Sequence, residues 1–212
     1  MRIDTLHVAG TYLIQPRIFP DDRGSFLELY SEPAFQQTVG HPFTAAQVNC
    51  SISRKGTVRG LHAIALGPGQ ARYVTCVSGS IVDIVVDVRV GSPTFGEHVR
   101  VVLDDKSRHA LYLAEGLAHG FAPVTEEATV VYLCSSTYKP GKEIRVHPLD
   151  PEIALPWPDL DQVILSEKDA AAPSLRESMD RGLLPDYAQC RDLYDRLRLA
   201  GGADPVAHDS LD

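Results

Sequence analysis

The run Ile81-Val82-Asp83-Ile84-Val85-Val86-Asp87-Val88-Arg89 has the two-residue period that is typical of a β-strand. Its even-numbered residues form one wholly apolar face, and its odd-numbered residues form a mixed face with two aspartates and an arginine. The turn sequence Gly91-Ser92-Pro93 follows and is expected to end the strand. The run therefore predicts one strand of a larger β-structure.

Short β-rich segments of the same kind continue on both sides of this run, between Val48 and Ser136. Turn residues such as Gly116 and Gly120 separate them. Many short strands divided by turns are typical of an all-β sandwich or barrel. The sequence therefore predicts a mainly β fold.

The C-terminal part of the chain has a different pattern. Prolines recur between residues 148 and 173 and forbid long regular elements, so this segment is expected to wrap the barrel as loops. Apolar residues recur at helical spacing between 187 and 197, which predicts a packed terminal helix. We expect a single domain over residues 1–199 and a disordered tail over 200–212.

Composition excludes several classes of protein. The net charge is −8 and the cations are dispersed, whereas nucleic-acid binding needs clustered positive charge. No apolar run is long enough to span a bilayer, and the first residues do not begin a signal segment. We therefore expect a soluble, cytoplasmic protein with no nucleic-acid or membrane partner.

The four cysteines, Cys50, Cys76, Cys134 and Cys190, lie far apart and form no CxxC pair. Each lies in an apolar-patterned stretch, where a reduced cysteine behaves as a small hydrophobic residue. This distribution argues against disulfides and against a zinc site.

The stretch Arg59-Gly60-Leu61-His62, with Arg72 ten residues after the histidine, is the most informative for function. If it is a regular strand, alternation places His62 on the face opposite Arg59 and Leu61. An imidazole can act as a base near neutral pH, and a guanidinium can bind an anion. By itself, the stretch is equally compatible with a core histidine beside a surface arginine.

A series of further motifs surrounds this stretch. In chain order they are Asp22-Arg23-Gly24-Ser25-Phe26-Leu27-Glu28, Gln47-Val48-Asn49, Arg59-Gly60-Leu61-His62, the run from Val82 to Arg89, Gly91-Ser92-Pro93-Thr94-Phe95-Gly96, Gly116-Leu117-Ala118-His119-Gly120-Phe121, Tyr132, Tyr138 and Leu165-Ser166-Glu167-Lys168-Asp169. In this order and spacing they resemble the dTDP-4-dehydrorhamnose 3,5-epimerase family, from about residue 1 to residue 199. The resemblance implies a cupin-like jelly-roll barrel with short helices and a C-terminal helix.

The resemblance also implies an activity: cofactor-independent epimerisation of a dTDP-4-keto-6-deoxyhexose at C3, C5 or both, in deoxysugar biosynthesis. Such chemistry needs a base on the carbon and a donor or cation on the ketone oxygen. By resemblance, His62 is the base, Asp169 orients it, Tyr132 returns a proton from the opposite face, and Arg72 stabilises the enolate.

The substrate-binding residues also come from the resemblance. They are Arg23, Phe26, Glu28, Gln47, Asn49, Arg59, His119, Tyr138, Glu143 and Lys168. The arginines are expected to bind the diphosphate and Tyr138 to stack on the thymine ring. The resemblance further implies a homodimer, in which phosphate-binding arginines of an N-terminal strand come from the neighbouring subunit.

A cupin-like barrel raises the alternative of a metal-dependent oxygenase. Such sites commonly have a His-x-His pair on one strand, but this chain has Leu61-His62-Ala63-Ile64 there, and a later candidate strand adds only His119. Two imidazoles are fewer ligands than such a site needs. No metal and no cofactor are therefore expected.

Position 72 departs from the family pattern, which has a lysine there. Arginine keeps the charge but is larger, planar and unable to release a proton, so the exchange is not conservative. Ala63 and Ile64 also replace aromatic and polar residues that often follow the histidine. Two alternatives therefore stay open: a single-carbon epimerase of an antibiotic deoxysugar pathway, or a catalytically impaired homologue that binds the nucleotide sugar.

Overall fold

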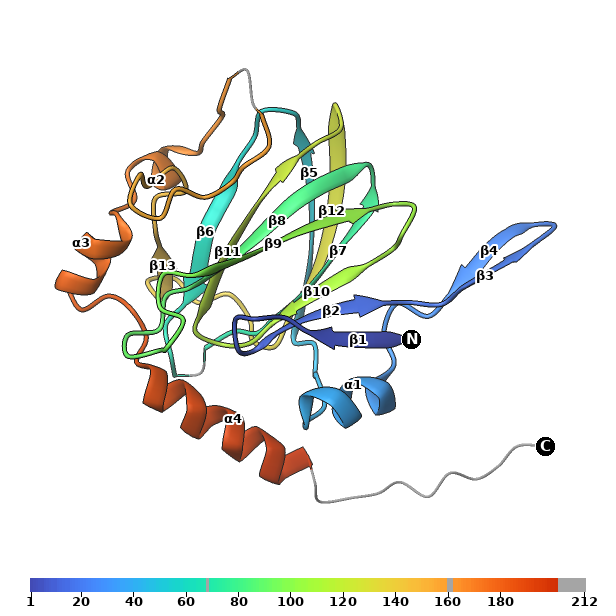
Figure 1. Ribbon diagram of the computed structural model, residues 1–212, viewed down its shortest axis with the longest axis horizontal. Helices are drawn as coiled ribbons and strands as arrows, with labels where there is room; N and C mark the ends of the chain where they lie inside the picture. The colour runs from blue at the N-terminus through green and yellow to red at the C-terminus, as the bar shows by residue number, and fades with distance from the viewer. Residues whose placement is uncertain (68, 160–161, 202–212) are drawn as a thin grey trace.

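The computed structural model describes residues 1–67, 69–159 and 162–201, and their strands form two packed sheets and a separate hairpin (Figure 1). The larger sheet contains, in spatial order, β1 (Arg2–Thr5), β2 (Thr11–Gln15), β10 (Ala110–Leu113), β7 (Arg72–Ser78), β12 (Glu127–Cys134) and β5 (Gln47–Arg54). The smaller sheet contains β13 (Glu143–Arg145), β6 (Arg59–Ile64), β11 (Leu117–Pro123), β8 (Ser80–Asp87) and β9 (His98–Asp104). All neighbouring strands in both sheets are antiparallel.

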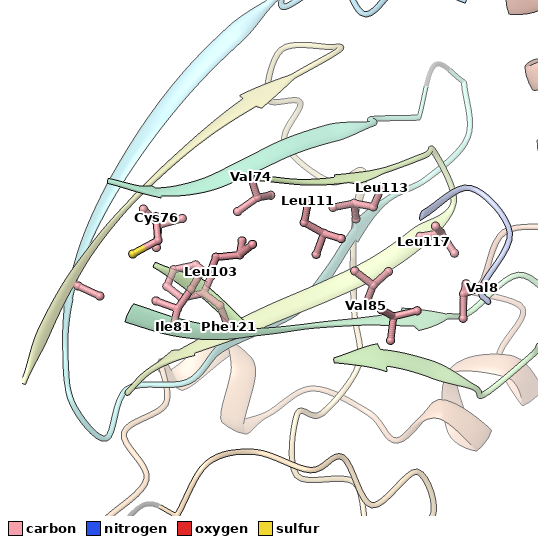
Figure 2. Packing of buried hydrophobic residues seen from close by; sticks show 13 residues of the cluster. Val8, Val74, Cys76, Ile81, Val85, Leu103, Leu111, Leu113, Leu117 and Phe121 are labelled. Carbon is pink, nitrogen blue, oxygen red and sulfur yellow. The ribbon is translucent and has the colours of Figure 1, made fainter. Parts of the chain in front are cut away.

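The main core lies between the two sheets. Figure 2 shows side chains of the two layers pointing toward one another, among them Val74 and Leu111 from the larger sheet and Ile81, Val85 and Phe121 from the smaller one. Each of these side chains is at least 95% buried. Two sheets that bury one face each against the other form the predicted cupin-like jelly roll.

The two predicted faces of the β8 run are confirmed, and the wholly apolar face points out of the barrel. Val82, Ile84 and Val86 pack in a second cluster with Leu175 and Trp157 of the C-terminal segment. The mixed, odd-numbered face lines the interior. A strand can turn its more apolar face outward here because another layer of chain covers that face.

The C-terminal wrap, defined here as the described residues between 148 and 186, provides this cover. As predicted, it is mostly irregular, with two short helices, α2 (Glu167–Ala170) and α3 (Leu175–Asp180). Backbone hydrogen bonds connect it to the segment just before β6: Val58 donates to the Ile164 carbonyl, and Ile164 donates to the Gly56 carbonyl.

Two helices pack near the outer face of the larger sheet, α1 (Glu32–Val39) and α4 (Tyr187–Gly201). Phe35 of α1 joins a third apolar cluster with Tyr73 and Tyr112, and Tyr194 of α4 packs against that cluster. The predicted terminal helix and its packing role are thus confirmed. The disordered tail was predicted to begin at residue 200, but residues 200 and 201 belong to α4. The rest of the predicted tail, residues 202–212, lies outside the described residues.

The hairpin β3 (Ile18–Asp21) and β4 (Gly24–Leu27) projects from the rest of the chain (Figure 1). All four residues of β3 are exposed, and Phe26 of β4 retains 65% of its surface. In β4, Gly24 adopts a positive φ of 136°, which favours glycine. Among the strands of the described residues, β3 and β4 pair only with each other.

All four cysteines are free thiols. Cys76, Cys134 and Cys190 are buried, in agreement with their expected role as small hydrophobic residues, whereas Cys50 is exposed. In the described part of the chain, no helix combines the length and apolar character needed to cross a membrane.

Candidate active site

The stretch from Arg59 to His62 forms the first part of β6 (Arg59–Ile64), but the regular alternation expected for it is wrong. His62 lies opposite His119 and Arg59 lies opposite Phe121, so β6 uses one more residue than β11 across this interval. Such a bulge changes the direction of the following side chains, and Arg59 and His62 both line the same cavity. Gly60 permits it, because its φ is 139° and a Cβ there would lie 2.5 Å from the Cα of Gly120.

The cavity has a volume of about 530 Å³ and lies among strands of both sheets and α2. It brings together all four predicted catalytic residues, which are His62, Arg72, Tyr132 and Asp169. It also brings together six of the predicted binding residues, which are Gln47, Asn49, Arg59, His119, Tyr138 and Glu143.

Four predicted binding residues do not line this cavity. Arg23 and Phe26 lie on the projecting hairpin, and Glu28 follows it in an exposed position. Lys168 is an exposed residue of α2, next to Asp169. Successive residues of a helix point about 100° apart, so Lys168 faces away although its neighbour lines the cavity.

His62 and Asp169 form a hydrogen-bonded pair on the cavity wall, with Nε2 2.7 Å from Oδ1. Their positions come from distant segments, β6 and α2, and Ser166 caps α2 by accepting from the Asp169 backbone amide. Burial alone would favour the neutral acid, but hydrogen bonds from His62, Ser166 and Arg145 outweigh it and lower the pKa of Asp169 to about 2. The carboxylate is therefore charged at neutral pH.

Arg145 is the residue of this cluster that the sequence interpretation missed. Its Nη1 lies 2.5 Å from Asp169 Oδ1 and 2.8 Å from His62 Nε2, and its Nη2 donates to Glu143 at 3.0 Å. The sequence did contain a signal for Arg145. Glu143 was predicted at the site, and alternation along a strand puts residue 145 on the same face as residue 143.

Arg72 is a buried cation that faces the cavity with 8% of its surface exposed. It donates from Nε to Gln70 Oε1 at 3.1 Å and from Nη1 to the carbonyl of His62 at 3.2 Å. Burial lowers the pKa of its guanidinium, and it forms no ion pair with a carboxylate of the described residues. An arginine in this state is suited to an anionic or developing negative charge of a ligand.

Tyr132 lies on β12 of the larger sheet and lines the cavity. Burial raises the pKa of its phenol, so the hydroxyl is protonated at neutral pH. Within the described ranges its hydroxyl has no hydrogen-bond partner, unlike those of Tyr73 and Tyr194, which donate to backbone carbonyls. The hydroxyl is therefore free to interact with a ligand.

His119 forms a second pair, with Nδ1 3.1 Å from Asp83 Oδ1 on β8. Burial lowers the pKa of this histidine, and the positive charge of Arg72 acts in the same direction. The ring is therefore neutral at pH 7.

The other end of the cavity is polar and partly open. Gln47 accepts from the backbone amide of Tyr138 and donates to Asn49, both at 2.8 Å. Arg59 is held by Ser53, whose hydroxyl accepts from Nε at 2.9 Å. The Tyr138 ring is 50% exposed, and such a ring can stack on a planar base.

No group of three or more His, Cys, Asp and Glu side chains in the described ranges is arranged to hold a metal ion. The cavity instead combines a histidine–carboxylate pair, a protonated phenol and a buried guanidinium.

The fold and the cavity define a cupin-like jelly-roll protein whose site carries acid–base groups. Comparison with known proteins gives the family: the dTDP-4-dehydrorhamnose 3,5-epimerase model matches residues 5–177, and the chain belongs to this family. It is an isomerase of the carbohydrate-epimerase type.

Individual relatives support the same assignment. A dTDP-4-dehydrorhamnose 3,5-epimerase of Mycolicibacterium smegmatis is 45% identical, over 91% of this chain and 95% of that protein. A dTDP-4-dehydrorhamnose 3-epimerase of Streptomyces niveus is 49% identical, over 90% and 92%. The crystal structure of ChmJ, a 3'-monoepimerase of Streptomyces bikiniensis in complex with dTDP-quinovose, matches with a TM-score of 0.89 and 43% identity, over 92% and 98%.

Proposed function

We propose that the protein epimerises a dTDP-4-keto-6-deoxyhexose at C3, C5 or both through an enolate, with proton-transfer groups of its own chain. The observation that carries the proposal is the shared cavity of the His62–Asp169 pair, Tyr132 and Arg72. The 4-keto group acidifies the protons on both neighbouring carbons, so one set of groups can act at either carbon. The family and its dTDP-sugar relatives support the substrate class.

In this proposal His62 removes the proton from the carbon next to the ketone. Asp169, charged at neutral pH, accepts a hydrogen bond from His62 Nε2 and stabilises the imidazolium that forms. The His62 side chain keeps 28% of its surface exposed, which gives a ligand access to the ring.

The electron pair left by the proton moves to the ketone oxygen, and Arg72 stabilises the resulting negative charge. Its guanidinium is already fixed by Gln70 and by the His62 carbonyl, so little reorganisation is needed during the reaction. The hydrogen bond to the His62 carbonyl also fixes the Arg72 guanidinium relative to the base.

Tyr132 then donates a proton to the other face of the same carbon, which inverts it. The two groups lie on different sheets, His62 on β6 and Tyr132 on β12, and both line the cavity. Inversion requires an acid and a base on opposite faces of the sugar ring, and the location of these two groups on different sheets supports the assignment.

Arg59, Gln47, Asn49 and Tyr138 are assigned to the nucleotide, with the guanidinium on a diphosphate oxygen and the Tyr138 ring on the thymine. Arg23 is assigned to the diphosphate of the neighbouring subunit in a homodimer. The projecting hairpin supports this assignment, because none of its residues lines the cavity of its own chain and its Phe26 ring is exposed.

The reaction is tested by incubating the protein with dTDP-4-keto-6-deoxyglucose in D2O and following deuterium at C3 and C5 by NMR. Uptake at both carbons indicates a double epimerase, and uptake at one carbon indicates a monoepimerase. A control without protein measures spontaneous exchange. No enzyme-dependent uptake, with intact dTDP binding, would establish a binding protein and contradict the proposal.

A single-carbon epimerase is the second candidate function. Two points favour it: position 72 is Arg72, where the family resemblance implies a lysine, and the Streptomyces niveus relative is named a 3-epimerase. The NMR experiment separates it from the double epimerase.

Sharing of the cavity between subunits is tested by mixing two variants, Arg23→Ala and His62→Asn. In a heterodimer, one cavity combines the intact His62 of the first variant with the intact Arg23 of the second, so activity returns on mixing. Light scattering gives the oligomeric state in parallel. A strict monomer, or no recovery when heterodimers are shown to form, contradicts the shared cavity.

A further inference from the structure

Arg145 touches both members of the His62–Asp169 pair, and no step of the proposed function uses it. One guanidinium nitrogen, Nη1, lies 2.5 Å from Asp169 Oδ1 and 2.8 Å from His62 Nε2. The other, Nη2, donates to Glu143 Oε2 at 3.0 Å. The guanidinium is therefore held between two carboxylates, directly beside the nitrogen of the base.

The sheet fixes this position. On β13, Ile144 packs in the outer apolar cluster, so alternation directs Glu143 and Arg145 to the cavity side. Arg145 is also the direct strand partner of His62 in the pairing of β13 with β6. Although burial disfavours its charge, the hydrogen bonds and charges of Glu143 and Asp169 raise the pKa of Arg145.

The three contacting atoms restrict where the proton on the His62 ring can be. A guanidinium only donates hydrogen bonds, so Arg145 donates to Asp169. The carboxylate oxygen has two lone pairs and can accept a second bond from His62 Nε2, 2.7 Å away. If Nε2 instead carried no proton, it could accept from Arg145 Nη1, 2.8 Å away, but it would face the charged Asp169 oxygen as acceptor against acceptor at 2.7 Å. The contact with the charged carboxylate is the shorter and stronger of the two, so it decides the position of the proton. The favoured neutral ring is protonated on Nε2, which leaves Nδ1 unprotonated.

We propose that Arg145 is a positioning residue for the base: it holds Asp169 Oδ1 where this oxygen accepts from His62 Nε2, so that Nδ1 is the nitrogen that takes the substrate proton. This role rests on the proposed function, because it requires His62 to be the base. In the described chain Nδ1 of His62 has no hydrogen-bond partner, so it is available to the substrate.

The charge of Arg145 has a second consequence. With a neutral His62, the cluster of Arg145, Asp169 and Glu143 has one positive and two negative charges, and proton transfer to His62 makes it neutral. Without Arg145 the same cluster would have two negative charges and would bind a proton on His62 more tightly. A base that is already protonated cannot accept the substrate proton, so loss of Arg145 should remove activity at the acidic end of the pH range.

Other titratable and charged groups also face this part of the cavity and affect the same pH range. They are Arg72 and Tyr132 from the larger sheet, and Arg59 and His119 from the smaller sheet, with Asp83 bonded to His119. An Arg145 variant keeps all of these residues, so comparing its pH profile with that of the wild type isolates the effect of Arg145.

The test compares Arg145→Gln and Arg145→Lys with wild type by steady-state kinetics, pH profile and calorimetry with dTDP. Arg145→Gln is expected to lower kcat by about 10²-fold, the scale of a misplaced reacting group, with dTDP affinity unchanged. The acidic limb of its kcat/KM profile should move to higher pH. Arg145→Lys keeps the charge but cannot bridge Asp169 and Glu143 as a fork, so kcat should recover in part and the acidic limb should return toward wild type.

Arg176→Gln is the matched control, since Arg176 of α3 pairs with Glu152 and does not line the cavity. Thermal unfolding of each variant shows whether it is folded. Weaker dTDP binding by Arg145→Gln would make Arg145 a nucleotide ligand and overturn the proposal. A wild-type rate and pH profile in a folded Arg145→Gln variant would also overturn it. Absence of exchange by the wild-type protein is a separate result, which contradicts the proposed function itself.

Discussion

Two histidines that line the cavity, His62 and His119, are each paired with an aspartate, and the two pairs differ in their surroundings. His62 and His119 lie opposite each other on β6 and β11. The His62 side chain is 28% exposed and its Nε2 lies 2.7 Å from Asp169, whereas the His119 side chain is 7% exposed and its Nδ1 lies 3.1 Å from Asp83. Asp169 comes from the C-terminal wrap, and Asp83 comes from the adjacent strand β8.

In the proposed function only His62 acts as the base, although both histidines have a hydrogen-bonded carboxylate. Burial lowers the pKa of His119 and its ring stays neutral, so it is suited to a hydrogen bond with the substrate. His62 combines a charged partner with access from the cavity, and proton transfer needs both. The assignment of the base to His62 therefore depends on exposure as much as on Asp169.

The strongest test of this difference replaces each histidine in turn. His62→Asn should reduce deuterium uptake at both carbons by at least about 10²–10⁴-fold, the usual contribution of a general base, with dTDP affinity nearly intact. His119→Asn should cause a smaller loss of exchange together with weaker substrate binding. NMR in D2O and calorimetry give both quantities. A larger loss of exchange in His119→Asn than in His62→Asn would reverse the roles of the two pairs.

Arg72 is linked to both pairs, since it donates to the His62 carbonyl and its charge also disfavours protonation of His119. Arg72→Met should raise the reaction barrier by about 3 kcal/mol, the scale of losing one oxyanion donor. Arg72→Lys should preserve exchange and increase the rate at the slower carbon, because a smaller head changes how the ring sits over His62. Identical C3-to-C5 exchange ratios in wild type and Arg72→Lys would show that position 72 does not select the carbon.

The smallest expected effect concerns stability in acid. The pKa of Asp169 falls from 3.8 to about 2 on folding, so this carboxylate stabilises the fold above pH 4 and loses its contribution as the pH falls from about 4 to 2. The contribution is on the order of 2 kcal/mol. Denaturant unfolding of wild type and Asp169→Asn should show a stability difference at pH 6 that shrinks below pH 4. A difference that is constant across this range would contradict the assigned contacts of Asp169.

The strand pattern from Ile81 to Arg89 was predictable because alternation is a local property of an extended chain. Which face would be interior was not, since the more apolar face is covered by residues such as Trp157, more than 60 positions later in the sequence. Alternation failed at Arg59 and His62 because one extra residue at Gly60 changes the direction of the strand.

The site residues also differ in how far the sequence alone could predict them. Periodicity could not pair His62 with Asp169, which are 107 residues apart, and only the family resemblance did so. Arg145 was missed although the two-residue spacing from Glu143 pointed to it. Asp83 was recognised as part of the mixed face of its strand, but its partner His119 became evident only in the register of β8 with β11.

The C-terminal wrap that covers the apolar strip of Val82, Ile84 and Val86 also carries Asp169. During translation all strands of both sheets leave the ribosome before this wrap does. Until then the nascent chain has an uncovered apolar surface, which favours aggregation, and a His62 without its carboxylate. The segment that covers this apolar surface is thus also the one that supplies the carboxylate partner of His62. We therefore expect a chain truncated near residue 150 to aggregate and to lack epimerase activity.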